Sequence, residues 1–380
     1  MGVATDIGAT APGLEAFQER VAALSVRQLM WLRYRRNRLA IIGGVFLLIM
    51  YLSALFAGFL APYGVRTTHD KYPAASPNSI RFLDAEGKFH LRPFVYGLKA
   101  EIDPQTFLKT YTPITDEIYP VKFFAKGVPY KLLGLIDTDI HLFGVDEPGK
   151  LFLLGTDRNG RDLFSRILYG AQVSLSVGLV GVMLSLVVGS FVGVMSGFYG
   201  GVVDNVVQRV IEVLTSFPQI PLWLALASAV PANWSPIKVY LGISIVLSIV
   251  GWGGLARQVR GMVLSLRETD YVMAARYANC SDLRIIVRHL LPNTLSHVLV
   301  IATMAIPGMI LGETALSFLG LGIRPPMTSW GVLLSEAQHV RVFLQQTWLL
   351  TPAIFVLAAI VSFNFVGDGA RDAADPFAAE

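Results

Sequence analysis

The sequence predicts an all-α integral membrane protein with six transmembrane helices and one long insertion after the first of them. Hydrophobic residues make up 53% of the 380 residues and charged residues only 15%, with a mean hydropathy of +0.55. These values are too apolar for a soluble domain of ordinary composition. Apolar runs also recur at the length of about 20 residues that a helix needs to cross a bilayer. Arginines beside these runs give them an orientation.

Six apolar runs are long enough to span a membrane. The first begins only near Leu39 and extends for about 23 residues, which exceeds the apolar part of a cleavable signal peptide. We therefore expect it to remain in the membrane as an anchor. The six expected helices cover residues 39–61, 173–197, 210–230, 239–256, 294–312 and 348–366.

Positive charge predicts which side of the membrane each loop faces. Loops rich in Lys and Arg stay in the cytoplasm, and arginine is frequent before the first helix. We therefore expect residues 1–38 to be a cytoplasmic segment, and six crossings return the C-terminus to the same side. The loop 257–293 is then cytoplasmic and holds a second arginine cluster. The two clusters comprise Arg27, Arg33, Arg35, Arg36 and Arg38, and Arg257, Arg260, Arg267, Arg276, Arg284 and Arg288.

Residues 62–154 form the expected extracytoplasmic insertion. Its Lys and Arg side chains balance its Asp and Glu side chains, and long loops are translocated regardless of charge. The aromatic content is too high for a disordered linker. We expect a small ordered lobe with short strands or turns, packed on the helix ends or on a partner. The remaining core is expected over residues 155–377.

Glycines and one ion pair in the apolar spans favour packing roles. Gly189, Gly193 and Gly197 recur every four residues, which favours close approach of a second helix over a pore-lining role. Glu212 follows Arg209 by three residues, so we expect the two to pair near the membrane interface.

Glu313 is the stronger candidate for a functional charge inside the membrane. An ionisable group there is costly unless it faces a cavity or a partner. Pro307 and two glycines precede it, which indicates irregular backbone of the kind tolerated beside protein or water. We expect Glu313 to face a translocation cavity, and a structural role is the equal alternative.

The segment "DYVMAARYANCSDLRIIVRHLLPN", residues 270–293, has two helical faces. Its first part places small or aromatic residues on one face and its second part places bulky residues on one face. We expect two short helices, the first lying in a groove of another protein and the second anchored on the chain's own membrane helices. The alternative is a helix resting on the lipid surface through its arginines. The two faces are Tyr271, Ala274, Ala275 and Ala278, and Leu283, Ile286, Val287, Leu290 and Leu291.

The chain shows no pattern for catalysis, metal binding or nucleotide binding. "GVDEPGKL", residues 144–151, has the spacing of a phosphate-binding loop, but Leu151 replaces the hydroxyl residue and acidic residues precede it. The six histidines do not approach the spacing of a zinc protease. We expect no catalytic residues, no cofactor and no metal. The net charge of only +4 also gives no indication of a nucleic-acid partner.

The 270–293 segment resembles the signature loop of ABC-importer membrane subunits, specifically the second permease of the dipeptide/oligopeptide/nickel group. Two residues depart from the usual form of that loop. Met273 replaces a usual Glu, which puts in doubt any salt bridge made by that Glu, and Asn279 replaces a usual Gly. Asn is the next-best residue for a left-handed turn, so we expect the turn to survive. Further stretches resemble the same group, namely "LGTDRNGRDLFSRILYGAQVSLSVG" (154–178), "GFYGGVVDNVVQRVIEVLTSFP" (197–218), "GETALSFLGLGIRPPMTSWG" (312–331) and "GDGARDAADPF" (367–377).

The resemblance covers nearly all of residues 152–377 and the arginine-flanked first helix. It implies the type I ABC importer permease (MetI-like) fold, with transmembrane helices 2–6 and the cytoplasmic coupling loop 257–293 in the permease core. It implies contacts with the ATPase at Asp270, Tyr271, Ala274, Ala275, Arg276, Asn279, Ser281 and Asp282. Glu313, Ser317 and Phe318 are the expected residues of the substrate pathway.

The resemblance also implies partners. A homologous permease would complete a heterodimer in the lipid of a bacterial inner membrane, two ATP-binding ABC subunits would drive it, and an extracytoplasmic binding protein would deliver the cargo. The group handles peptides, nickel, opines and oligosaccharides, and the sequence does not choose among them. A stand-alone channel or a membrane-embedded enzyme is the competing functional class.

Overall fold

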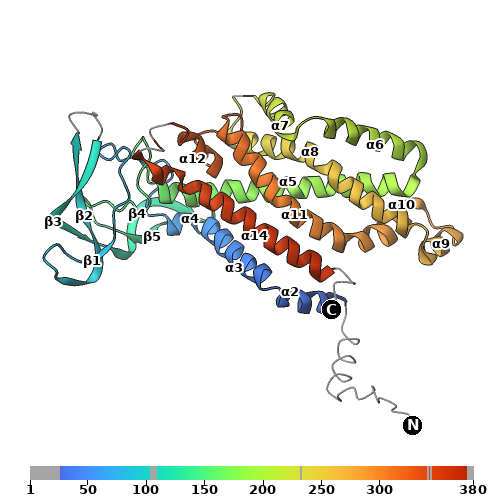
Figure 1. The fold of residues 1–380 in the computed structure, drawn as a ribbon, viewed down its shortest axis with the longest axis horizontal. Coiled ribbons are helices and arrows are strands. Elements are labelled where there is room, and N and C mark those ends of the chain that lie inside the picture. Colours follow the sequence, from blue (N-terminus) through green and yellow to red (C-terminus); the bar gives the residue numbers. More distant parts are fainter. Residues whose placement is uncertain (1–25, 103–108, 232, 340–341, 343–344, 375–380) are drawn as a thin grey trace, which may run out of the picture.

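The computed structural model describes residues 26–102, 109–231, 233–339, 342 and 345–374, which form a helical bundle with a β lobe at one end (Figure 1). Predictions for residues 1–25 and 375–377 lie outside this range. The first helices are α2 (Val26–Arg36), α3 (Arg38–Leu55), α4 (Ala57–Leu60), α5 (Leu163–Tyr199), α6 (Gly201–Ser216) and α7 (Gln219–Ser228). They are followed by α8 (Pro236–Leu266), α9 (Asp270–Tyr277), α10 (Asp282–Ile285), a π-helical turn (Ile286–Leu290), α11 (Leu291–Phe318), α12 (Trp330–Glu336), a 3₁₀ turn (Thr347–Leu350) and α14 (Thr351–Ala374).

Within the described part of the chain, five helical segments are long and apolar enough to cross a membrane. The sixth predicted span, residues 210–230, is not one straight helix. It corresponds to α6 and α7, whose axes differ by 92°. Phe217, between them, is extended, with φ −86° and ψ 141°. Pro218 follows it, and a proline disfavours helical backbone in the residue before it, so the break has a local cause.

The segment predicted as the loop 257–293 is more helical than expected. α8 continues to Leu266, and α9 is a separate short helix as predicted. The second predicted helix is not separate, because α10 passes through the π-helical turn directly into α11. α11 also continues through Pro307, so the irregular backbone expected before Glu313 is absent from this helix.

Close packing of α5 on α8 confirms the interpretation of the glycine repeat. A Cβ atom on Gly193 would lie 2.5 Å from the carbonyl oxygen of Ala256, and one on Gly189 would lie 2.9 Å from that of Trp252. One on Gly197 would likewise lie 2.9 Å from the Arg260 carbonyl. Small residues therefore allow the two backbones to approach.

The insertion is a β structure, so the all-α description holds for the membrane part alone. Strands β1 (Arg81–Leu83), β2 (Phe89–Ile102) and β3 (Lys109–Pro120) form one antiparallel sheet. Strands β4 (Lys122–Leu132) and β5 (Ile136–Gly144) form a separate hairpin. The lobe is ordered as expected, but β2, with 14 residues, is much longer than the short strands predicted.

Side chains and backbone groups join the lobe to the adjacent ends of the helices. Tyr63 lies between the two parts: its amide donates to Ser165 Oγ at 3.2 Å, and its hydroxyl accepts from the amide of Leu151 at 2.9 Å. The Asp162 side chain caps α5 by accepting from the amide of Ser165 at 2.8 Å. The start of α5 is therefore fixed by both its own cap and the lobe.

Candidate functional site

Helix α9 is attached to the bundle by one buried face. Val272 and Ala275 pack into a hydrophobic cluster with Phe198 of α5 and Val263 of α8. Ala275 is only 8% exposed, so the prediction that it contacts a partner is wrong. Residues three apart share a helix face, and the face opposite Val272 and Ala275 is the one left exposed.

Asn279 confirms the predicted left-handed turn after α9. Its φ is +56°, a conformation that Asn tolerates better than most residues. The amide of Asn279 donates to the carbonyl of Arg276 at 2.9 Å, and the amide of Cys280 donates to that of Ala275 at 3.1 Å. This pair of bonds is a Schellman motif, which ends a helix by satisfying its last carbonyls. The turn survives without the usual Gly.

After this turn, the buried and exposed residues are not the ones that the sequence predicts. Ile285, Ile286 and Leu290 are buried against the bundle. Leu283 is 68% exposed and Val287 is 54% exposed, so the expectation that both anchor the segment is wrong. Tyr277 of α9, not predicted as a contact, is 84% exposed. The exposed face of the segment, as we use the term below, consists of Ala274, Tyr277, Ala278, Leu283 and Val287.

The other predicted coupling residues are exposed at the same end of the bundle, opposite the β lobe (Figure 1). The Arg276 guanidinium lies 5.0 Å from the centre of the Phe198 ring, a cation–π contact within the chain. The Tyr271 hydroxyl accepts from the Asn293 amide nitrogen at 3.2 Å. Asp270, Asn279, Ser281 and Asp282 are also exposed. Tyr277 could have been found from sequence, because it lies on the same helix face as Asp270 and Ala274.

Ion pairs lock the helices beneath this segment. The Arg260 guanidinium donates to both carboxylate oxygens of Asp204, each at 2.5 Å, which joins α8 to α6. Ser196 of α5 donates to the same carboxylate at 2.5 Å. Such bidentate pairs fix geometry more strongly than single hydrogen bonds. The predicted pair of Arg209 and Glu212 is also confirmed, with Nη1 2.7 Å from Oε2.

Glu313 lies at the centre of a buried polar cluster and not on a cavity. Its side chain is fully buried, and its two oxygens accept from Ser174 at 2.9 Å and from Ser317 at 2.7 Å. The same serine oxygens also accept hydrogen bonds from backbone amides: Ser174 Oγ from the amide of Trp330, and Ser317 Oγ from the amide of Ile323. The prediction that Glu313 faces the translocation cavity is therefore wrong. The carboxylate instead joins α5 and α11 to the start of α12.

The three predicted pathway residues do not line one surface. Ser317 is buried with Glu313, whereas Phe318 is 38% exposed. A cleft of about 550 Å³ lies elsewhere, between α5, α8, α11 and α14. Its polar lining residues are Ser185, Gln258, His297 and Arg371. This cleft, which sequence reasoning missed, is the better candidate for a surface that meets a solute.

A second ion-pair network lies at the lobe end of the bundle. Arg166 of α5 donates to Asp157 at 2.5 Å and to both oxygens of Glu336 on α12, at 2.6 and 2.9 Å. Arg161 contacts the same two acids. Burial by itself raises the pKa of the Glu336 carboxyl, but the two guanidinium groups outweigh burial and hold that pKa below its ordinary value. No local sequence pattern indicates this pairing, because Glu336 lies about 170 residues away from Arg166.

Two family models match the chain. The model described as "Binding-protein-dependent transport system inner membrane component" matches residues 189–379, and "N-terminal TM domain of oligopeptide transport permease C" matches residues 25–77. The oligopeptide transport system permease protein OppC of Haemophilus influenzae is 42% identical over 224 residues, which are 58% of this chain and 69% of that protein.

A longer match extends across the lobe. The dipeptide transport system permease protein DppC of Lactococcus lactis subsp. cremoris is 33% identical over 365 residues, which are 95% of this chain and 94% of that protein. Among solved structures, a chain of the MetNI methionine ABC transporter in inward-facing conformations aligns with a TM-score of 0.43 and 19% identity, over 55% of this chain and 96% of that chain.

Proposed function

Because the chain belongs to the family of binding-protein-dependent transport system inner membrane components, we propose that it forms half of a peptide-import pathway and that α9 couples this half to an ATPase. The coupling role rests on one observation: α9 is attached to the bundle by one buried face and leaves its opposite face exposed. Val272 and Ala275 hold α9 on α5 and α8, while Ala274, Tyr277 and Ala278 remain free for a partner. A helix presented in this way suits a groove in another protein.

Peptides are the proposed cargo. The relatives in Haemophilus influenzae and Lactococcus lactis carry the names of oligopeptide and dipeptide permeases, and a permease in Pectobacterium atrosepticum that is 36% identical is named for glutathione. All three names describe short peptides or a peptide-like molecule. The cleft beside Gln258, His297 and Arg371 offers hydrogen bonds and a positive charge to such a solute.

The proposed assembly has three kinds of protein partner. A homologous permease completes the pathway as a heterodimer, two ATP-binding ABC subunits engage the two permeases, and a binding protein meets the lobe. Both termini are cytoplasmic in this arrangement, and the lobe is outside. The arginines of α2 and of the 257–293 segment support this orientation, because positive charge favours the cytoplasmic side.

Movement of α9 is passed to the membrane helices through the buried face of α9. The cluster that contains Val272 and Ala275 also contains Phe198 of α5 and Val263 of α8, two of the four helices that line the cleft. A displacement of α9 by a closing ATPase therefore moves α5 and α8 with it. Alternating access needs such rigid-body motion of packed helices.

Replacement of Ala274 by Arg tests the coupling role. Ala274 is exposed, so the long side chain is tolerated in the isolated chain but enters the partner contact in the complex. Burial of an unpaired charge costs several kcal/mol, and every 1.4 kcal/mol lowers occupancy about tenfold. We expect loss of ATPase copurification and of binding-protein-stimulated ATP hydrolysis from complexes in nanodiscs.

Ala85→Arg is the matched control, because Ala85 is an exposed alanine in the lobe. It should retain the ATPase at normal stoichiometry. Normal stoichiometry and stimulated hydrolysis in the Ala274→Arg complex would overturn the coupling role and favour a segment that rests on lipid.

A further inference from the structure

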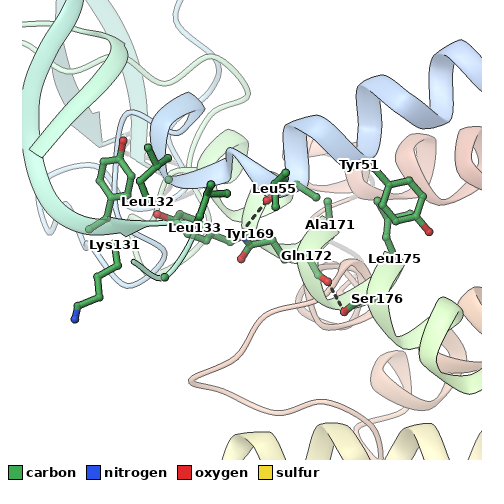
Figure 2. Close-up of a pocket in the computed structure, with 14 residues that line it drawn as sticks. Tyr51, Leu55, Lys131, Leu132, Leu133, Tyr169, Ala171, Gln172, Leu175 and Ser176 are labelled. Atoms are coloured by element: carbon green, nitrogen blue, oxygen red, sulfur yellow. Dashed lines mark hydrogen bonds between the residues drawn. The ribbon is translucent and has the colours of Figure 1, made fainter. Parts of the chain in front are cut away.

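A pocket of about 550 Å³ lies between α3, α5 and the turn that joins β4 to β5 (Figure 2). Its lining includes Tyr51 and Leu55 of α3, Ala171 and Leu175 of α5, and Leu133 of the turn. Its size falls in the range of about 300–1,000 Å³ that is usual for small-ligand sites. In Figure 2, Leu132 and Leu133 lie at the end near Leu55 and Tyr169, while Tyr51 and Leu175 lie further along the membrane helices. The pocket therefore runs from the lobe into the depth of the spans.

Three polar side chains of the lining already donate hydrogen bonds to backbone carbonyl groups. The Gln172 amide nitrogen donates to the carbonyl of Ala54 at 2.8 Å, and the Ser176 hydroxyl donates to that of Gln172 at 2.5 Å. The Tyr130 hydroxyl donates to the carbonyl of Ile140 at 2.8 Å. With these three donors in use, the side-chain polar groups left for a solute are few, chiefly the hydroxyls of Tyr51 and Tyr169 and the Lys131 ammonium. An apolar ligand fits this lining better.

The β4–β5 hairpin is held in place beside the outer end of α3. The Tyr130 ring packs against Gly58 of α4, with no room for a Cβ atom at Gly58. His141 has Nδ1 2.9 Å from the Gly58 carbonyl oxygen and Nε2 3.0 Å from that of Val128. The rings of Phe59 and Phe124 are 6.2 Å apart. These contacts fix the hairpin relative to α4 and the end of α3.

The tip of this hairpin is apolar and exposed. Leu133, Leu135 and Ile136 are 48%, 83% and 60% exposed. Lys131 and Asp137 flank them with exposed charges and form a pair with Nζ 3.9 Å from Oδ1. An apolar tip with charges and tyrosines behind it is the composition of a segment at the boundary between headgroups and acyl chains.

From this geometry we propose that the β4–β5 turn is inserted into the leaflet on the side of the lobe and that the pocket holds an acyl chain of a phospholipid. The lipid chain covers Leu55, which is 53% exposed, and the Lys131 ammonium, which points away from the pocket in Figure 2, faces the phosphate. The occupant is a lipid because the pocket is continuous with the membrane-spanning surfaces of α3 and α5 and its lining offers hydrocarbon. The lobe is thereby anchored to the bilayer as well as to the helices.

Fluorescence quenching tests insertion of the turn. A fluorophore is attached to Leu135→Cys in a Cys280→Ser chain, assembled with cysteine-free partner subunits in nanodiscs. Leu91→Cys is the matched control, because Leu91 is 88% exposed in β2 of the three-stranded sheet. We expect lipids with a doxyl group on the acyl chain to quench position 135, and aqueous iodide to quench position 91. Iodide quenching at position 135 overturns the proposal, and so does shielding from both quenchers, which would place a protein partner over the tip.

Native mass spectrometry of the same complex tests occupation of the pocket. Ser176→Trp fills the pocket, whereas Leu179→Trp places the same side chain on an exposed position of α5 outside it. We expect the Ser176→Trp complex to lose one bound phospholipid, with at least about a fivefold fall in its retention, and the Leu179→Trp complex to keep it. Equal retention overturns the proposal. Neither readout measures transport or ATP hydrolysis, so the result is independent of the proposed coupling role.

Discussion

Glu313 shows how the role of one residue depends on partners far away in sequence. An acidic residue in an apolar span indicates function by default, yet its two oxygens are occupied by Ser174 and Ser317. Ser174 lies 139 residues earlier in the chain. Each serine hydroxyl donates a hydrogen bond to the Glu313 side chain and accepts one from a backbone amide, so the cluster is a connected hydrogen-bond network. This network holds the first residue of α12, Trp330, in place.

Replacement of Glu313 by Gln should destabilise this cluster. The amide keeps the shape but offers one acceptor oxygen, so one of the two serine hydroxyls loses its acceptor. A buried polar group without a partner costs about 1–3 kcal/mol. We expect a lower thermal unfolding temperature of the purified complex, and a further fall with Glu313→Ala. Glu212→Gln is the control, because Glu212 is 53% exposed and should change stability little. Unchanged unfolding with normal uptake would argue against the structural role.

The residue-scale predictions succeeded where the signal was local. The turn at Asn279 and the pair of Arg209 with Glu212 depend on residues within a few positions of each other. The burial of Ala275 was missed because the small-residue pattern does not say which side of α9 meets the bundle. The partners of Glu313 and Arg166 were missed because tertiary contacts, not local spacing, bring them together.

At the scale of elements, the sequence indicates where the long helices and the bend lie, and the bend makes the number of straight spans differ from the number of apolar runs. Apolar length located the long helices, since the bilayer imposes it. The bend between α6 and α7 did have a signal, namely Pro218 and the extended residue before it. The β lobe was harder, because β2 shows a broken alternation of buried and exposed residues that local propensity does not predict.

The contact between α5 and α8 should be sensitive to single methyl groups. Gly193→Ala places a Cβ atom 2.5 Å from the Ala256 carbonyl oxygen, so the two backbones must separate. Overpacking of this kind typically costs about 1–3 kcal/mol. We expect a lower unfolding temperature and weaker coupling between ATP hydrolysis and uptake. Gly261→Ala on α8 is the control, because no atom lies within 4 Å of a Cβ atom there. If both variants behave alike, close approach of α5 and α8 is not the reason for Gly193.

At the scale of the whole molecule, the lobe and the bundle meet at a junction that includes His69. Its ring lies between those of Tyr63 and Phe152, with centroids 4.6 and 5.2 Å away, and its amide donates to the Gly160 carbonyl at 2.9 Å. Burial, helped by the charge of Lys150, lowers the pKa of His69 to about 4. The ordinary pKa of histidine is about 6.5.

Acid should therefore loosen the lobe. Because the folded pKa is depressed, the stabilisation is complete above about pH 6.5 and is lost as pH falls toward about 4. We expect a loss of about 1–2 kcal/mol, after allowance for solvent screening of a partly exposed ring. Hydrogen exchange around Tyr63 and Phe152, corrected for the intrinsic pH effect, should quicken in this range. His69→Phe keeps a ring and cannot titrate, so it should remove the effect. An identical pH response in that variant would exclude His69 as the cause.

Helix α5 has a consequence for how the two ends of the molecule communicate. Its 37 residues extend for roughly 55 Å, well beyond a hydrocarbon core of about 30 Å. One end is clamped beside the lobe through Asp162 and Arg166, and the other lies under Arg276 of α9. Because α5 is one continuous helix that is packed at both ends, we expect a tilt imposed at one end to be transmitted to the other. In the proposed assembly, a binding protein at the lobe and an ATPase at α9 would therefore act on opposite ends of the same helix.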